Sequence, residues 1–229
     1  VERGKVTADE AQAGMARLTT TTETGEALAG TDFVIEAAPE RIDLKLALLA
    51  EVDRLAPAEA VVATNTFALS ITEMAGALTR PARVGGMHFF NPVHKMKLIE
   101  IVRALESSDE TLETIAAVTQ AMGKETVVVR EAPGFITTRV NASIGNEAFY
   151  MLMEGVASAR DIDKALKLGL NHPMGPFELV DLVGLDTRLS ILEYLHRTMG
   201  EKYRPCPLLV QYVKAGRLGK KVGKGVYEY

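Results

Sequence analysis

The chain lacks the features that mark secreted, membrane-spanning and nucleic-acid-binding proteins. It has 229 residues and a single cysteine, Cys206, so no disulfide forms within the chain, which fits a reducing compartment. No apolar run reaches the roughly 18–20 residues that a membrane-spanning helix needs, and the opening VERGKVTADEAQAG has no signal-peptide pattern. The formal net charge of -4 argues against nucleic acid, because phosphate binding needs a basic face. These absences predict a cytoplasmic protein with no membrane or nucleic-acid partner.

Apolar strands and helical segments alternate over residues 1–131. Continuous apolar runs predict strands at 33–37, 60–65, 83–90, 98–102 and 126–129, and helical spacing predicts helices at 7–18, 43–56, 70–78 and 109–122. Thr7 and Ser70 each precede a glutamate by three residues, which is the capping box of a helix start. Strands that alternate with helices in this way indicate βαβ units, so we expect an open α/β domain with a mainly parallel sheet.

The pattern changes at Pro133-Gly134. Beyond this break, apolar residues recur at helical spacing over 136–155, 158–170 and 175–200, and the last of these stretches has room for one or two helices. No convincing strand appears before the end of the chain. The sequence therefore predicts two domains, an α/β domain over 1–131 and an all-α domain over 132–229.

Polar residues follow three of the predicted strands at the point where each strand ends. These segments are 36–40, 64–66 and 88–91, and the last of them contains His88. In an open parallel sheet, ligands bind beyond the carboxyl ends of the strands. We therefore expect a cofactor and a substrate at this edge of the sheet.

His88 and Glu100 stand in otherwise apolar strands, with a proline-containing loop between them. A buried charge is costly unless it is paired, and a loop of this kind reverses the chain, so we expect the two side chains to meet. A carboxylate on one imidazole nitrogen sets the tautomer and favours the protonated ring, which leaves the other nitrogen to exchange a proton. Two interpretations stay open here: a structural pair that bridges two strands, and a general acid–base pair.

Several motifs resemble one known family. The segments VIEAAPE, HFFNPV with MKLIEI, PGFI, NHPMGPFELVDLVGLDT and GKKVGKGVYEY are similar to signatures of the L-3-hydroxyacyl-CoA dehydrogenases, which include bacterial 3-hydroxybutyryl-CoA dehydrogenases. The resemblance covers essentially the whole chain, and its motifs occur at consistent separations. It implies a Rossmann-like NAD-binding domain followed by a helical domain that carries substrate contacts and a homodimer interface.

The resemblance also implies an activity and a set of roles. The reaction is the NAD-dependent oxidation of a 3-hydroxyacyl-CoA to the 3-ketoacyl-CoA, or the reverse, as in fatty-acid metabolism. His88 would be the general base, Glu100 its orienting partner, and Asn91 a contact near the reacting carbon. Residues in the positions of the family's NAD contacts are Ala37, Glu40, Lys45, Asn65, Asn91 and Lys221, and candidate substrate contacts are Asn91, Thr138 and Asn141. No group of residues has metal-ligand spacing, so no metal is expected.

The chain departs from the family pattern in three places. No strand followed by G-x-G-x-x-G occurs in it, so it is expected to begin about one βαβ unit late; the glycine-rich GRLGKKVGKG follows no strand and opens no helix. Phe67 stands where the family usually has a hydrogen-bonding serine, and Thr138 where it often has an asparagine, for which Asn141 is placed one helical turn later. These departures leave an alternative, a non-catalytic truncated member that keeps dimerisation and acyl-CoA binding.

Overall fold

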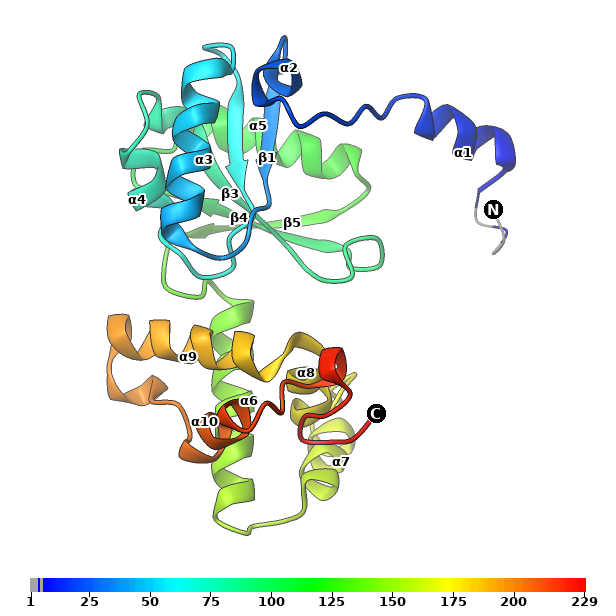
Figure 1. Cartoon of the computed structure of the whole chain (residues 1–229), viewed down its shortest axis with the longest axis vertical. Coiled ribbons are helices and arrows are strands. Elements are labelled where there is room, and N and C mark those ends of the chain that lie inside the picture. The colour runs from blue at the N-terminus through cyan, green and yellow to red at the C-terminus, as the bar shows by residue number, and fades with distance from the viewer. Residues whose placement is uncertain (1–3, 5) are drawn as a thin grey trace.

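The computed structural model describes residue 4 and residues 6–229, which form two domains connected through one long helix (Figure 1). The first domain is α/β and the second is helical, so the predicted fold class is confirmed. The α/β domain contains, in chain order, α1 (Ala8–Met15), α2 (Thr24–Leu28), β1 (Phe33–Glu36), α3 (Ile42–Leu55), β2 (Val61–Thr64), α4 (Ile71–Gly76), η1 (Pro81–Arg83), β3 (Val84–Phe89), β4 (Leu98–Arg103), α5 (Asp109–Ala121) and β5 (Glu125–Arg130).

The five strands form one sheet in the order β1-β2-β3-β4-β5. All neighbouring strands are parallel except β3 and β4, which run antiparallel. The loop over 90–97 reverses the chain between these two strands, because it contains no helix that would carry the chain back across the sheet. The expectation of a mainly parallel sheet with a reversal after His88 is therefore confirmed.

Helices cover both faces of this sheet, and alternate strand residues enter two different clusters. Val62 packs with residues of α3 and α4 on one face, whereas Val61 packs with residues of α5 on the other. This two-sided burial is the reason that the strands are continuously apolar. Gly86 in β3 allows α4 a close approach, because a Cβ at this position would lie 2.4 Å from Cδ1 of Ile71.

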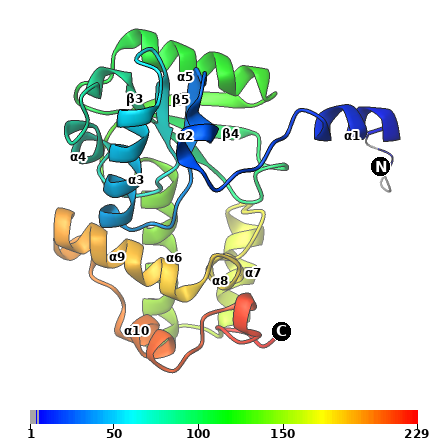
Figure 2. The same ribbon diagram turned by 45° about the horizontal axis from the view of Figure 1, so that its top comes forward.

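The helix α1 stands away from both domains in Figures 1 and 2, and it buries none of its residues. Its start is nevertheless the predicted one. The Thr7 hydroxyl accepts a hydrogen bond from the Glu10 amide at 3.2 Å, and the Glu10 carboxylate accepts one from the Thr7 amide at 2.7 Å. Local capping therefore supports this helix without tertiary packing.

The second domain is built around α6, with helices packed along it (Figure 1). Its core gathers large apolar side chains such as Phe149, Phe177, Leu192 and Leu209. In the part of the chain that the structure describes, no helix is long and apolar enough to cross a membrane. The elements are α6 (Thr137–Met153), α7 (Ala159–Gly169), α8 (Pro176–Val183), α9 (Leu185–Met199), η2 (Glu201–Tyr203), α10 (Pro207–Lys214) and η3 (Lys220–Val222).

The helices agree with the expectation over 175–200 and differ from it at two other points. The stretch 175–200 contains two helices, because the backbone of Gly184 has a φ of 106° and breaks the helical path between α8 and α9. The helix α2 was not predicted, since it has five residues and no side-chain cap. The helix α10 was not predicted either, because Pro207 masks its start, although proline is well tolerated at the first helical position.

Candidate active site

The carboxyl ends of β1, β2 and β3 meet at one edge of the sheet, beside the point where α6 begins. Asn65 connects these ends: its amide nitrogen donates to the carbonyl of Glu36 at 2.7 Å, and its Oδ1 accepts from the amide of Phe89 at 3.0 Å. The structure therefore brings together the polar strand ends that the sequence analysis singled out. The amide hydrogens of the Asn65 side chain are left for a ligand.

His88 and Glu100 occupy opposite positions in the antiparallel pair of β3 and β4. The distance from Nδ1 of His88 to Oε2 of Glu100 is 2.7 Å, and the two side chains are 7% and 0% exposed. The expected contact between them is confirmed. Because the carboxylate accepts, Nδ1 carries the proton in the neutral ring, and Nε2 keeps a lone pair for a proton from a ligand.

Glu100 also receives hydrogen bonds from the start of α6. The Thr137 amide donates to its Oε1 at 3.1 Å, and the Thr137 hydroxyl donates to its Oε2 at 3.2 Å. Burial by itself raises the pKa of Glu100, but the hydrogen bonds from His88 and Thr137 outweigh it, so the pKa lies below its usual value. The carboxylate is therefore ionised at neutral pH, and it stabilises the imidazolium when His88 takes a proton.

Two phenylalanines pack near the imidazole ring of His88. The Phe90 ring centroid lies 4.7 Å from it and the Phe135 centroid 5.7 Å from it. Phe135 is buried, and its φ of 48° is uncommon for a residue other than glycine. Tertiary contacts hold this backbone in place, since Phe135 joins the cluster between the sheet, α3 and α4. The aromatic rings shield parts of the imidazole from water.

A second pair of charges lies at the end of β1 and is fully buried. The Lys45 ammonium donates to the two carboxylate oxygens of Glu36 at 2.8 and 2.9 Å and to the carbonyl of Ala38 at 3.1 Å. These contacts use all three of its donors. The direct cofactor contact expected for Lys45 is therefore corrected. Its ammonium instead holds the backbone after β1 through the carbonyl of Ala38.

Glu40 organises the loop that follows β2. Its Oε1 accepts hydrogen bonds from the Thr66 hydroxyl and from the amides of Phe67 and Ala68, at 2.5, 3.0 and 3.1 Å. The Phe67 side chain packs against the core cluster of the helical domain, so it spans the junction of the two domains. Glu40 thus positions Phe67 beside the strand ends.

The remaining candidates occupy three different places. Ala37 and Asn91 are exposed at the ends of β1 and β3. Thr138 follows Thr137 in the first turn of α6 and is half-buried, and Asn141 is exposed one turn later. Lys221 lies against the start of α9, where its ammonium pairs with Asp186 at 2.6 Å.

Sequence reasoning did not identify Thr137, Phe135 or the Glu36–Lys45 pair as parts of this site. For the pair a signal existed, because Glu36 interrupts an apolar strand and Lys45 shares the buried face of α3 with Leu49. For Thr137 no signal existed, since only the folded chain brings it to Glu100.

Comparison with known proteins identifies the chain. Residues 1–132 match the NAD-binding domain of 3-hydroxyacyl-CoA dehydrogenase, and residues 134–229 match the C-terminal domain of the same enzymes. The chain belongs to the 3-hydroxyacyl-CoA dehydrogenase family. A probable 3-hydroxybutyryl-CoA dehydrogenase of Bacillus subtilis is 48% identical over 229 residues, which are 100% of this chain and 79% of the relative. The 3-hydroxyadipyl-CoA dehydrogenase of Escherichia coli is 42% identical over 100% of this chain and 48% of its own length.

Solved structures agree with this family assignment. The (S)-3-hydroxybutyryl-CoA dehydrogenase of Ralstonia eutropha superimposes with a TM-score of 0.95 at 42% identity, covering 100% of this chain and 81% of that one. FadB2 of M. tuberculosis gives a TM-score of 0.96 at 38% identity, with the same coverage of both chains.

The strand-end edge fits the nicotinamide end of NAD, the cofactor that the family implies. Asn65 has free amide hydrogens there, Ala37 and Asn91 are exposed, and His88 lies alongside them. A hydride acceptor needs a position next to the group that removes the hydroxyl proton, and this edge provides one. Ala37, Asn65 and Asn91 are the residues that would hold the cofactor, with Glu40 and Lys45 supporting the loops around it.

Proposed function

We propose that the site of this 3-hydroxyacyl-CoA dehydrogenase interconverts 3-hydroxyacyl-CoA and 3-ketoacyl-CoA through the His88–Glu100 pair. The observation that carries the proposal is the 2.7 Å contact between Nδ1 of His88 and the buried Glu100, which directs Nε2 to a ligand. Two interpretations of the pair were open from sequence. The position of the pair at the carboxyl ends of the parallel strands supports the acid–base one.

In the oxidising direction, Nε2 of His88 accepts the proton of the substrate hydroxyl. NAD supplies the acceptor for the hydride that leaves the same carbon. Glu100 keeps Nδ1 protonated and balances the charge that the imidazole acquires. The reverse direction uses the same groups, with His88 donating its proton to the oxygen of the 3-keto group.

Other side chains position the reactants in this proposal. Asn91, at the mouth of the site, orients the substrate near the reacting carbon. Thr138 and Asn141 on α6 contact the substrate from the helical domain. Lys221, near the end of the chain, contacts NAD. The names of four relatives, which are 3-hydroxybutyryl-CoA dehydrogenases or probable ones, favour a short acyl chain.

The test is the oxidation of NADH by acetoacetyl-CoA, followed by the absorbance of the reduced nicotinamide. We expect turnover that depends on both substrates. A second candidate function, acyl-CoA binding without redox chemistry, is favoured by one observation, the bulky Phe67 at the domain junction. Two results together would favour this second candidate: the folded wild type binds acetoacetyl-CoA without turnover, and Phe67→Ser restores turnover.

We also propose that the protein is a homodimer assembled through its helical domain. The helix α8 carries two neighbouring apolar side chains, Leu182 and Val183, that remain 45% and 41% exposed. Association with a second copy of the chain would bury them. Light scattering should give twice the mass of the chain, and Leu182→Glu with Val183→Glu should reduce it to the single-chain mass. A wild-type monomer at micromolar concentration would contradict the proposal.

The cytoplasm is the proposed location of the enzyme. The cysteine Cys206 is buried and free, which fits a reducing compartment. Fractionation of the cells, followed by detection of the chain in each fraction, tests this placement.

A further inference from the structure

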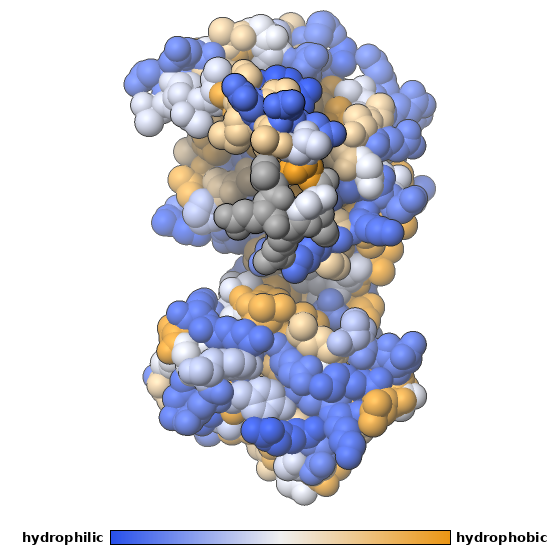
Figure 3. Space-filling view, turned by 90° about the vertical axis from the view of Figure 1, so that its right-hand side faces the viewer, coloured by the Kyte–Doolittle hydropathy of each residue, from blue (hydrophilic) through white to orange (hydrophobic). Residues whose placement is uncertain are grey.

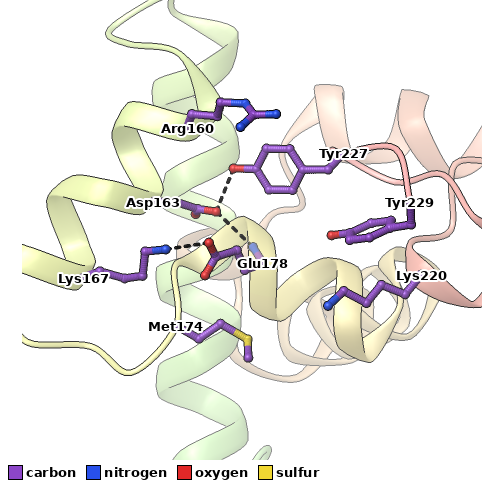
Figure 4. Close-up of a pocket in the computed structure, with 8 residues that line it drawn as sticks. All are labelled: Arg160, Asp163, Lys167, Met174, Glu178, Lys220, Tyr227 and Tyr229. Carbon is purple, nitrogen blue, oxygen red and sulfur yellow. Dashed lines mark hydrogen bonds and ion pairs between the residues drawn. The ribbon is translucent and has the colours of Figure 1, made fainter.

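A pocket of about 430 Å³ lies in the helical domain, where the end of the chain packs on α7 and α8 (Figure 4). None of its lining residues comes from the α/β domain. Tyr227 and Tyr229 form one wall, Arg160 and Lys167 project from α7, and Met174 closes the floor below them. The volume is within the range of small-molecule sites in proteins, which is about 300–1,000 Å³.

Two buried carboxylates hold the tyrosine rings in place. The Tyr227 hydroxyl donates to Asp163 at 2.7 Å, and the Tyr229 hydroxyl donates to Asp181 at 2.9 Å. Burial, together with these carboxylates, raises the pKa of both tyrosines above its usual value. The rings therefore present a neutral and fixed wall, and their hydroxyl groups take no part in ligand binding.

The carboxylate of Asp163 is engaged by the protein itself. It accepts hydrogen bonds from the amides of Phe177 and Glu178 at 2.8 and 3.1 Å, at the start of α8. A Cβ on Gly175 would lie 2.3 Å from its Cγ, so the turn before α8 is closed tightly around it. Asp163 thus offsets the positive end of the helix dipole, and its hydrogen bonds come from the protein itself.

Two cations at the pocket have no carboxylate of their own. Lys167 pairs with Glu178 at 2.6 Å. Arg160 lies over the ring of Tyr227 at 5.9 Å and Lys220 over the ring of Tyr229 at 5.0 Å, and neither forms an ion pair in the described part of the chain. The hydrogen bonds from Lys167 and Gly175 are the main reasons that the pKa of Glu178 is lowered. The charge of Lys220 makes a smaller contribution to this lowering.

We propose that this pocket binds the phosphate groups of an adenine nucleotide. Arg160 and Lys220 both face the hollow without an ion pair in the described part of the chain, and two such cations beside one cavity attract a phosphate group. Guanidinium and ammonium groups are the usual phosphate donors in proteins. The tyrosines and the thioether of Met174 provide a surface for a flat base. A free nucleotide and the nucleotide end of coenzyme A share this chemistry.

The methyl group of Met174 provides a local signal for the test, because Met174 lines this pocket and the residues of the strand-end site do not. In protein labelled with 13C on the methionine methyls, the Met174 signal is assigned through Met174→Leu. ADP and the adenosine bisphosphate that ends coenzyme A are then titrated separately. We expect at least one of them to shift this signal in a saturable manner, with a dissociation constant below about 1 mM.

The decisive variant is Arg160→Gln with Lys220→Gln, for which we expect binding about 10-fold or more weaker. Lys164→Gln with Lys214→Gln is the matched control, since it removes the same charge from exposed positions on α7 and α10 and should bind as the wild type does. An unchanged Met174 signal with both nucleotides overturns the proposal. Equal affinity in the two double variants also overturns it, because binding would then not depend on the pocket cations.

Enzyme kinetics distinguish the two sources of the nucleotide. If the ligand is the end of coenzyme A, Arg160→Gln with Lys220→Gln raises the KM for acetoacetyl-CoA about 10-fold and leaves kcat unchanged. The KM for acetoacetyl-pantetheine, which has no nucleotide, then stays the same. If the ligand is a free nucleotide, neither KM changes in its absence, while the Met174 shift with ADP is still lost. The methionine signal does not depend on turnover, so failure of the proposed function is distinguishable from failure of this site.

Discussion

Replacing His88 by glutamine should lower kcat for the reduction of acetoacetyl-CoA by NADH about 1,000-fold and leave the fold intact. The amide of glutamine fills much of the same space but has no group that accepts and releases a proton at neutral pH. Steady-state rates for the wild type and the variant measure the effect. Circular dichroism and the unfolding midpoint in urea show that the variant is folded. Turnover close to that of the wild type would end the proposed role of His88.

Glu100→Gln is the companion variant, and it tests positioning separately from proton transfer. We expect kcat to fall about 10- to 100-fold, because the amide neither fixes the tautomer of His88 nor balances the imidazolium charge. A second readout follows from the lowered pKa of Glu100. Its stabilising contribution is present above the unfolded pKa and is lost as the pH falls through the folded one. The stability of Glu100→Gln should therefore change less than that of the wild type in this acidic range.

Glu36→Gln should reduce the free energy of unfolding by about 3–5 kcal/mol. The substitution leaves the ammonium of Lys45 buried at the end of β1, where both side chains are at most 1% exposed, with only the more distant Glu40 carboxylate, 3.7 Å away, as a counter-ion. Urea denaturation of the wild type and the variant gives the difference. A loss below about 1 kcal/mol would show that the buried ammonium finds another partner or loses its proton at little cost.

The double variant Glu36→Gln with Lys45→Met provides the control for this prediction. It removes both charges and keeps the side-chain volume of α3, so most of the lost stability should return. The hydrogen bonds from Thr64 and Ala38 to the carboxylate are weakened in both variants, so they do not explain a difference between them. Because the carboxylate of Glu36 accepts from the amide of Ala38 and Lys45 donates to its carbonyl, we expect weaker NAD binding in both variants, detectable by titration of NADH fluorescence.

The expected secondary structure agrees with the observed structure wherever a periodic pattern is long. All five strands and the helices α3, α5, α6 and α7 lie where the apolar spacing predicts them. Local chemistry also determines several ends, such as the helix starts capped by Ser70 and Ser158. The helices α2 and α10 were not predicted, because neither has a capping residue at its start.

The sequence likewise predicts one part of the candidate site and leaves another part open. The contact between His88 and Glu100 could be predicted from the residues alone, because a reversing loop places their strands side by side and a buried charge requires a partner. The hydrogen bonds from Thr137 to Glu100 and from Lys45 to Glu36 could be seen only in the folded chain. Such contacts join segments far apart in the chain, and their geometry depends on how the helices pack on the sheet. No local sequence pattern predicts that packing.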